Sequence, residues 1–341
     1  MNRVDFLYLS QEDIIKAGGL DFNIFIDTLE KILGTHAKGD FVQPLKPYLK
    51  RKEQTHVADR IIAMPSYVGG DFDISGIKWI SSASQNPVKY NLPRASGVII
   101  LNDSEKGIPV AVMDATLINL MRTAAVSGVA TKYLARENSR KIGIIGAGII
   151  GKMQVKAVHN VIPEINEIKV YDLNKERAIH WSNTLEKEIG VKIIIAKSAQ
   201  DALQNADIII TSTTAEEGYI EGDWIKKGSL FLNVSLNDPK FDVILKADKI
   251  IVDDWEQCNR KDKVLNKMYK QKLISEQDIH AELGEIVLKQ KTGRISEDEI
   301  IFFNPMGMSV EDIGSAYTIY KRAKDLGIGT TLSLWEKPIG V

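Results

Sequence analysis

A glycine-rich turn made of Gly146, Ala147, Gly148, Ile149, Ile150 and Gly151 follows a short apolar segment, and an acid, Asp172, comes about 20 residues later. In such a turn the first glycine permits the tight bend, the second lets the backbone approach a pyrophosphate, and the third lets strand and helix pack closely. The N–H groups at the start of the next helix would bind the phosphates. A carboxylate at Asp172 would bind a ribose 2′-hydroxyl and repel a 2′-phosphate, so the pattern predicts NAD rather than NADP as the cofactor.

Three cationic side chains before this turn occupy positions where a charge needs a partner. Strand alternation places Lys78 on the same face as Ile74 and Ile80, where a cation requires an anionic partner or a ligand. Arg122 is predicted at the start of an alanine-rich helix, where the helix dipole disfavours a positive charge. Arg60 directly precedes an apolar run. An ordinary surface position, with the charged end in water, remains the alternative for each of them.

One carboxylate stands where ligand-facing loops are expected. Asp238 follows the predicted strand 230–234, and ligands of parallel sheets bind beside the carboxyl ends of the strands. The sequence Asn237-Asp-Pro is also an ordinary turn signal, so a purely structural role stays open. The five histidines show no pair at metal-ligand spacing, and the single cysteine, Cys258, cannot form a zinc cluster. No metal site is therefore expected.

The elements that must position these residues form two domains. From residue 141 the chain alternates strands and helices, which predicts an α/β fold with a Rossmann-type, doubly wound parallel sheet. The expected strands span 142–145, 167–171, 192–196, 207–211, 230–234, 249–252 and 299–303. The segment before it is mixed, with a helix over 24–37 and an antiparallel hairpin formed by 96–101 and 108–113.

The helix after residue 308 suggests that the first domain is discontinuous. Ser309-Val-Glu-Asp312 resembles a capping box that opens a helix through about Lys324. This helix is expected to return to the N-terminal segment. The prediction is an α+β substrate-binding and dimerisation domain of residues 1–120 with 309–341, and an NAD-binding domain of residues 121–308. The active site is expected in the cleft between the two domains.

Composition narrows the class of protein. The 341-residue chain has 44 Lys and Arg against 45 Asp and Glu, a net charge of −1, so no general attraction to nucleic acid or membrane is expected. The sequence contains no apolar run of membrane-spanning length, and its first residues lack the apolar run of a signal peptide. With a single cysteine no internal disulfide can form, and a cytoplasmic protein is expected.

Three motifs combine in this chain: Gly76-Ile-Lys78-Trp with Asn86-Pro, then Met121-Arg122-Thr-Ala-Ala-Val-Ser, then Asn304-Pro-Met-Gly307-Met-Ser-Val-Glu-Asp312. Together they resemble the ornithine cyclodeaminase/μ-crystallin family over nearly the whole chain. The resemblance implies an NAD-dependent enzyme that acts on an amino acid and forms homodimers through its non-Rossmann domain. It also places Thr123 and Met306, which lie in the matching motifs, among the cofactor-binding residues.

The resemblance assigns roles to the charged residues. The family's substrate carboxylate is held by cations that match Arg60, Lys78 and Arg122, and its catalytic aspartate matches Asp238. Asp238 would act as a general base. Lys78 would bind the carboxylate and could also transfer a proton, because burial should lower its pKa.

Four further segments resemble one branch of the family: Asp40-Phe-Val-Gln-Pro-Leu-Lys46-Pro-Tyr, Ala58-Asp-Arg60-Ile-Ile-Ala-Met-Pro, Arg94-Ala-Ser-Gly-Val-Ile-Ile-Leu-Asn and Asp253-Asp-Trp-Glu-Gln-Cys-Asn-Arg260. That branch oxidatively cleaves a glutamate whose nitrogen carries a 2-amino-2-carboxyethyl group, and releases L-2,3-diaminopropionate for siderophore or antibiotic synthesis. Its substrate has three carboxylates. Arg94 and Lys46 are therefore candidates for additional carboxylate anchors, with ordinary surface charge as the alternative.

Other activities of the family stay open from the sequence: cyclodeamination of ornithine, and oxidation or reduction of alanine or a cyclic ketimine. Cyclodeaminases carry a glycine-rich segment, Gly-Gly-Asp-Cys-Pro-Gly-Lys, around the aspartate. Here the segment is Val234-Ser-Leu-Asn-Asp238-Pro-Lys240, which argues against proline formation. A dinucleotide-binding protein without catalysis is a third possibility, against which the retained cations and Asp238 argue.

Overall fold

The computed structural model describes residues 3–52, 59–235, 237–260 and 263–339. Two residues of the motifs quoted above lie outside these ranges: Ala58, and Leu236 in the segment around Asp238. The chain divides into two compact units: Met1–Arg122 with Met308–Val341, and Thr123–Gly307. The first unit is thus built from both ends of the chain, and the boundary between the units falls inside helix α4 (Ala115–Leu134).

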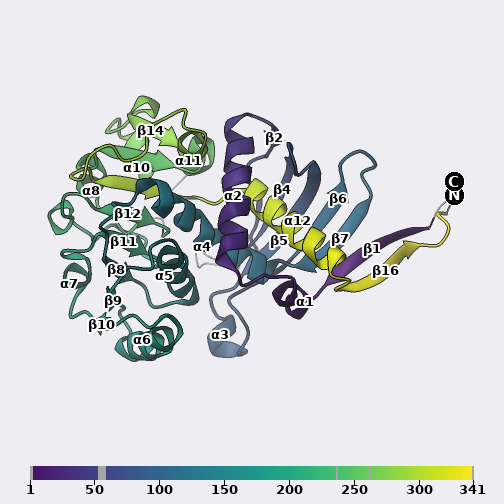
Figure 1. The fold of residues 1–341 in the computed structure, drawn as a ribbon, viewed down its shortest axis with the longest axis horizontal. Coiled ribbons are helices and arrows are strands. Elements are labelled where there is room, and N and C mark those ends of the chain that lie inside the picture. The colour runs from purple at the N-terminus through teal and green to yellow at the C-terminus, as the bar shows by residue number, and fades with distance from the viewer. Residues whose placement is uncertain (1–2, 53–58, 236, 261–262, 340–341) are drawn as a thin grey trace. The chain divides into compact units, whose positions relative to one another are not determined.

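The first unit is a mixed sheet with helices on one face (Figure 1). The strand order is β16-β1-β7-β6-β5-β4-β2, with β3 paired to β4; β1 and β7 run parallel and the other pairs are antiparallel. The strands are β1 (Val4–Leu9), β2 (Phe41–Val42), β3 (Tyr48–Leu49), β4 (Arg60–Val68), β5 (Ile74–Ser82), β6 (Ala95–Asp103), β7 (Pro109–Asp114) and β16 (Thr330–Trp335). Strands β6 and β7 confirm the predicted hairpin.

Two long helices bury the inner face of this sheet. Helix α2 (Phe22–Ala37) confirms the helix predicted over 24–37, and Asp21 caps it by accepting a hydrogen bond from the Asn23 N–H. Helix α12 (Ser309–Asp325) packs on α2 and across β4, β5 and β6. A Cβ atom at Gly314 would lie 2.5 Å from the Ile32 side chain, so glycine allows the two helices to approach closely. The short helices of this unit are α1 (Gln11–Lys16) and α3 (Asn86–Lys89).

The expected start of α12 is wrong by one residue. The N-cap is Met308, and the Glu311 carboxylate accepts the Met308 N–H at 3.0 Å. Ser309 does not cap the helix; its hydroxyl donates to Gln43 Oε1. Asp312, which the pattern assigned to a capping box, instead makes the ion pairs described below.

The second unit is a fully parallel sheet of eight strands, in the order β10-β9-β8-β11-β12-β15-β13-β14. This order starts as that of a doubly wound nucleotide-binding fold, whose direction of winding reverses between β8 and β11. The strands are β8 (Lys141–Ile145), β9 (Glu167–Tyr171), β10 (Ile193–Ile195), β11 (Ile208–Thr211), β12 (Leu230–Asn233), β13 (Lys249–Val252), β14 (Ile279–Glu282) and β15 (Ile301–Asn304). The seven predicted strands are all present, and the α/β fold class is as expected.

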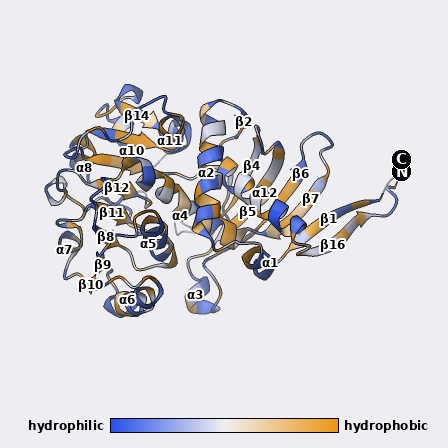
Figure 2. Cartoon of the chain, in the orientation of Figure 1, coloured by the Kyte–Doolittle hydropathy of each residue, from blue (hydrophilic) through white to orange (hydrophobic). Residues whose placement is uncertain are grey.

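Strand β14 was not predicted from the sequence, because its four residues, Ile-His-Ala-Glu, do not form an apolar run. Strands β11, β12, β13 and β15 are mostly apolar and buried along their whole length. Figure 2 shows the hydropathy of the chain. The rings of Phe231 and Phe302 contact each other in a tilted arrangement within this core, with 5.3 Å between their centroids. The helices are α5 (Ile149–Val161), α6 (Lys175–Ile189), α7 (Ala199–Leu203), α8 (Phe241–Leu245), α9 (Trp255–Cys258), α10 (Val264–Lys270) and α11 (Leu283–Val287).

Within the described residues, no helix has the length and apolar character needed to cross a membrane.

Candidate active site

The glycine turn joins β8 to α5 and is shaped to leave room for a ligand. Gly146 has φ +103°, and a Cβ there would lie 2.7 Å from the Ser212 carbonyl oxygen. A Cβ at Gly151 would collide with the Gly146 carbonyl oxygen. A Cβ at Gly148, in contrast, would meet nothing within 4 Å. Packing of the protein itself therefore explains Gly146 and Gly151, whereas the space beside Gly148 fits the close approach of a dinucleotide.

The first turn of α5 is suited to an anion. Its N-cap is Gly148, and within the described part of the chain no side chain caps it. The N–H groups of Ile149 and Ile150 at the helix start therefore point toward the space beside the turn. The Trp181 indole N–H donates to the Gly148 carbonyl oxygen at 3.1 Å, which fixes the turn against α6.

Asp172, at the end of β9, is held as a carboxylate. It accepts the N–H groups of Ala147 and Asn174, each at 2.8 Å, and pairs with the Arg177 guanidinium at 2.7 Å. Burial alone would raise the pKa of Asp172, but these hydrogen bonds and the Arg177 charge outweigh it and lower the pKa below its ordinary value. The bond to Ala147 ties the acid directly to the glycine turn.

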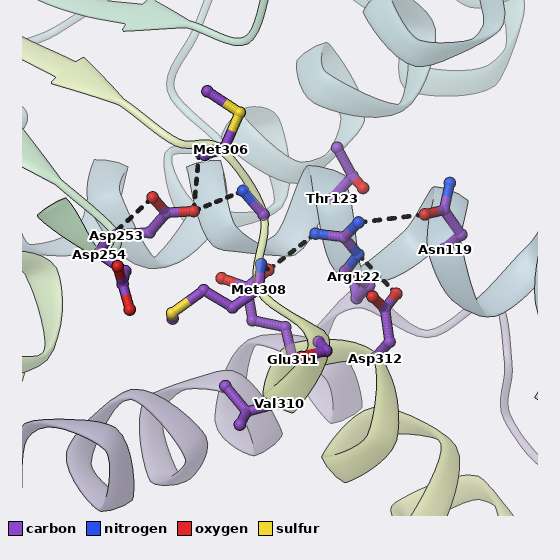
Figure 3. Close-up of polar contacts among 12 residues, drawn as sticks. Asn119, Arg122, Thr123, Asp253, Asp254, Met306, Met308, Val310, Glu311 and Asp312 are labelled. Atoms are coloured by element: carbon purple, nitrogen blue, oxygen red, sulfur yellow. Dashed lines mark hydrogen bonds and ion pairs between the residues drawn. The ribbon is translucent and has the colours of Figure 1, made fainter. Parts of the chain in front are cut away.

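The first unit contains a buried cluster of opposite charges (Figure 3). Lys78 Nζ on β5 donates to Asp312 Oδ2 at 2.5 Å and to Asn119 Oδ1 at 2.8 Å. Arg122 on α4 pairs with the other oxygen of Asp312 at 2.8 Å and with Glu311 at 2.7 Å. Helix α12 thus supplies two carboxylates that hold the two cations side by side.

Arg122 does not lie at the start of its helix, as the sequence suggested. Helix α4 begins at Ala115, about two turns earlier, directly after the last residue of β7. The Leu117 N–H is capped by the Asp114 carboxylate. The helix dipole therefore does not disfavour the charge of Arg122. Its ion pairs with Glu311 and Asp312 of α12 explain why a cation is buried there.

Lys78 is almost completely buried, with 1% of its surface exposed. Burial lowers its pKa to about 7, and the neighbouring charges of Arg122 and Lys46 act in the same direction, while Asp312 opposes them. A lysine with a pKa near neutrality can both bind a carboxylate and exchange a proton. The sequence-based expectation for its pKa is met.

The other predicted anchors fall into two groups along the sheet. Lys46 is buried, between β2 and β3, and its charge acts on Lys78. Arg60 lies at the far end of β4, where it pairs with Ser82, and its guanidinium stacks on the Tyr48 ring at 4.7 Å. Arg94 is exposed and precedes Ala95, which also pairs with Ser82. Lys46, Lys78 and Arg122 are therefore brought together, and Arg60 and Arg94 mark a separate end of the sheet.

Asp238 is a fully buried carboxylate with two unlike oxygens. Its Oδ1 accepts the hydroxyls of Thr213 at 2.6 Å and Tyr219 at 2.8 Å. Its Oδ2 has no hydrogen-bond partner among the described residues. Asp238 follows β12 and Thr213 follows the adjacent β11, so both lie at the carboxyl edge where ligands of parallel sheets bind.

The family model described as "Ornithine cyclodeaminase/mu-crystallin family" matches residues 10–327. The chain belongs to this family. Among its relatives is N-((2S)-2-amino-2-carboxyethyl)-L-glutamate dehydrogenase of Staphylococcus aureus, 47% identical over 98% of this chain and 100% of the relative.

Solved structures of the family share the complete fold. Δ1-Pyrroline-2-carboxylate reductase of Thermococcus litoralis, in complex with NADH and L-proline, is 34% identical with a TM-score of 0.87, over 95% of this chain and 99% of that one. An archaeal alanine dehydrogenase dimer with bound NAD is 29% identical with a TM-score of 0.87, over 97% and 100%. The Rossmann-type fold and the family predicted from the motifs are thus confirmed.

The family's Asn304 to Asp312 motif includes a loop that a buried acid holds, and the sequence analysis missed it. Asp253 Oδ2 accepts the N–H groups of Met306 at 2.8 Å and Gly307 at 2.5 Å (Figure 3). Gly307 has φ +75°, a conformation that favours glycine. Asp253 thereby fixes the backbone at Met306, a predicted cofactor contact. Thr123, the other such residue on a family motif, accepts the Gln154 side-chain amide at its carbonyl oxygen.

Asn119, Glu311, Asp312, Thr213 and Tyr219 were also not singled out as functional from the sequence. Glu311 and Asp312 lay in a motif that was interpreted as a helix cap, and their cationic partners are distant in sequence. Within the described part of the chain, no group of three or more His, Cys, Asp and Glu residues could hold a metal ion.

Replacing Asp172 by serine is expected to shift the cofactor preference of this family member from NAD toward NADP. The change removes the charge that repels a 2′-phosphate and releases the Arg177 guanidinium, which can then bind it. We expect the ratio of the two dissociation constants, measured by quenching of protein fluorescence, to change by at least about tenfold. The double variant Asp172→Ser, Arg177→Ala should lose the gain for NADP. An unchanged preference in Asp172→Ser would show that another residue sets it.

Proposed function

We propose that this protein oxidatively cleaves N-((2S)-2-amino-2-carboxyethyl)-L-glutamate with NAD, releasing L-2,3-diaminopropionate, 2-oxoglutarate and NADH. The observation that carries the proposal is the 47% identity, over the full length of both chains, to the S. aureus dehydrogenase of that name. The buried cations of the first unit support it, since this substrate carries three carboxylates. The chain is an NAD-dependent oxidoreductase acting on a CH–NH substrate.

We assign the cofactor to the second unit. Gly146, Gly148 and Gly151, with the intervening Ala147, Ile149 and Ile150, would hold the pyrophosphate, and Asp172 the adenosine ribose. Thr123 and Met306 complete the predicted contacts. NAD, when bound, supplies the acceptor for the hydride.

The cations would bind and orient the substrate. Lys78 and Arg122 are fixed by their shared partner Asp312, so their N–H groups keep a defined direction before the substrate arrives. We assign the glutamyl α-carboxylate to this pair. Lys46, beside Lys78, is the candidate for a second carboxylate, and Arg60 and Arg94, near the Ser82 end of β5, are the candidates for a third.

Asp238 would act as the base. Its Oδ2 takes a proton from the secondary amine, whose electron pair then assists departure of the hydride from the glutamyl Cα. Water adds to the resulting imine carbon, and the carbinolamine breaks at its C–N bond. The nitrogen leaves with the protonated diaminopropionate, and the carbon becomes the ketone of 2-oxoglutarate. Lys78, with a pKa of about 7, can return a proton in this last step.

A substrate panel tests the proposal. The purified protein is incubated with NAD and, separately, the triacid, ornithine, alanine and proline, and NADH absorbance is followed while products are identified by mass spectrometry. We expect one NADH, one diaminopropionate and one 2-oxoglutarate per triacid consumed. Conversion of ornithine to proline without net NADH, or oxidation of alanine or proline in preference to the triacid, would contradict the proposal and assign another activity of the family. NAD binding with no turnover of any substrate would indicate a binding protein.

The protein is also proposed to be a homodimer joined through the outer face of the first sheet. Strand alternation puts apolar side chains on the face opposite α2 and α12. They stay substantially exposed in the single chain: Tyr8, Trp79, Val98, Leu332 and Leu334, each at 40–43%. Exposed apolar side chains on one face of a sheet typically mark an interface.

The Trp79→Glu variant is expected to shift the protein from dimer to monomer. Trp79 faces Val98 of the adjacent strand on this face, so a charge there would have to be buried in the interface. Light scattering coupled to size-exclusion chromatography measures the mass. Ile295→Glu, at an equally apolar but 72% exposed position of the second unit, is the matched control and should leave the mass unchanged. A wild-type monomer, or a dimer in the Trp79 variant, would contradict the assignment.

A further inference from the structure

The two oxygens of the Asp238 carboxylate have unequal surroundings, although the side chain is fully buried. Oδ1 accepts two hydroxyl protons, from Thr213 and Tyr219. Oδ2 accepts none from the described residues. A buried oxygen without a donor is costly in a folded protein unless a ligand or a reaction makes use of it.

The Thr213 hydroxyl is aimed at Asp238 by its own loop. Its oxygen accepts the Ala215 N–H at 3.1 Å, so its proton is directed to Asp238 Oδ1 at 2.6 Å. This arrangement gives the threonine hydroxyl one role as acceptor and one as donor.

The Tyr219 hydroxyl donates its proton to Asp238 Oδ1 at 2.8 Å. Burial and the adjacent Asp238 charge strongly raise the pKa of Tyr219, so its phenol stays protonated throughout the working pH range. The backbone holds it in register, because the Asp238 carbonyl oxygen accepts the N–H groups of Tyr219 at 2.9 Å and Ile220 at 3.0 Å. Tyr219 and Asp238 are therefore connected by a backbone hydrogen bond as well as by the hydrogen bond between their side chains.

We propose that Thr213 and Tyr219 are positioning residues for the reaction: their protons occupy Oδ1 and leave Oδ2 as the atom that takes the substrate proton. This inference rests on the function proposed above. In the step concerned the substrate N–H bond breaks, its electron pair stays on nitrogen, and the proton forms an O–H bond with Oδ2. Both hydroxyls donate to the same oxygen of the carboxylate, Oδ1.

The alternative is that the hydroxyls only satisfy a buried acid and hold the loop. The two roles differ in the pH profile. If Asp238 is the base, kcat/KM falls at acidic pH as its carboxylate becomes protonated. Removing a hydroxyl that stabilises the carboxylate then raises the pH of this acidic limb, whereas a purely structural loss lowers activity at every pH alike.

The experiment measures kcat/KM from pH 5 to 9, with NAD affinity and melting temperature, for Tyr219→Phe, Thr213→Val and Thr213→Ser. We expect the acidic limb to move up by about one pH unit in Tyr219→Phe and in Thr213→Val, which corresponds to a tenfold change in proton affinity. Thr213→Ser, which keeps the hydroxyl, should hold the limb at the wild-type pH. Tyr269→Phe, at a partly exposed tyrosine that packs edge-on against Trp255, is the matched control.

An acidic limb that stays in place in both Tyr219→Phe and Thr213→Val would overturn the inference. If Tyr219→Phe fails to fold, the comparison of Thr213→Val with Thr213→Ser still tests the inference. Serine keeps the hydroxyl that donates to Asp238, and valine removes it. Failure of the proposed function is a different result: the wild-type protein would then not oxidise the triacid at any pH.

Discussion

The Asp238→Asn variant is expected to turn over its substrate at least about a hundredfold more slowly than the wild type, since a general base contributes roughly 10²–10⁴ in rate. Asparagine keeps the shape of the side chain and can still accept the Thr213 and Tyr219 hydroxyls, but it cannot take a proton. Stopped-flow or steady-state formation of NADH measures the effect.

Asp223→Asn is the matched control for this prediction. Asp223 belongs to the same unit, and its side chain is 87% exposed and paired with Lys246 on the surface. Its turnover should remain near the wild-type value. Turnover within a few-fold of wild type in Asp238→Asn, with an unchanged melting temperature, would remove Asp238 from the mechanism.

The Lys78→Met variant is expected to lose at least about a hundredfold in kcat/KM, because it removes a buried, charge-assisted contact to the substrate carboxylate. Methionine fills a similar volume and leaves Asp312 paired with Arg122, so the protein should stay folded. Circular dichroism and melting temperature check folding, and NAD affinity should be unchanged.

The lowered pKa of Lys78 also predicts how kcat/KM depends on pH. The pKa of Lys78 is lowered to about 7, mainly by burial, so in the free enzyme the ammonium that binds a carboxylate is present below that pH and lost above it. We expect kcat/KM of the wild type to fall as the pH rises above about 7, and this alkaline limb to be absent from Lys78→Met. An unchanged limb in the variant, or turnover close to wild type, would contradict the role given to Lys78.

The regular parts of this structure were accessible from the sequence because they depend on local patterns. Short apolar runs separated by helical segments predicted the strands of the parallel sheet, and the spacing from Gly146 to Asp172 predicted the turn and its acid. The start of α4 was missed, since β7 ends at Asp114 and the helix begins at the next residue. No glycine or proline separates them, and the apolar residues continue across the boundary.

The candidate site residues of the two units were accessible only in part, because the partners of each are distant along the chain. Lys78 was recognised as a cation on an apolar face, but its acid, Asp312, lies 234 residues later and resembled part of a helix cap. Asp238 occupies a sequence that is typical of a turn. Its complete burial, and the difference between its two oxygens, depend on Thr213 and Tyr219, which no local pattern connects to it.

We propose that the cations of the first unit present an amino-acid carbon for oxidation while Asp238 takes the nitrogen's proton. The most direct measurement uses the triacid with deuterium at the glutamyl Cα, and locates the label by mass spectrometry after turnover with NAD. We expect deuterium in the reduced cofactor and none in L-2,3-diaminopropionate. Unlabelled NADH, or deuterium retained in either organic product, would contradict it.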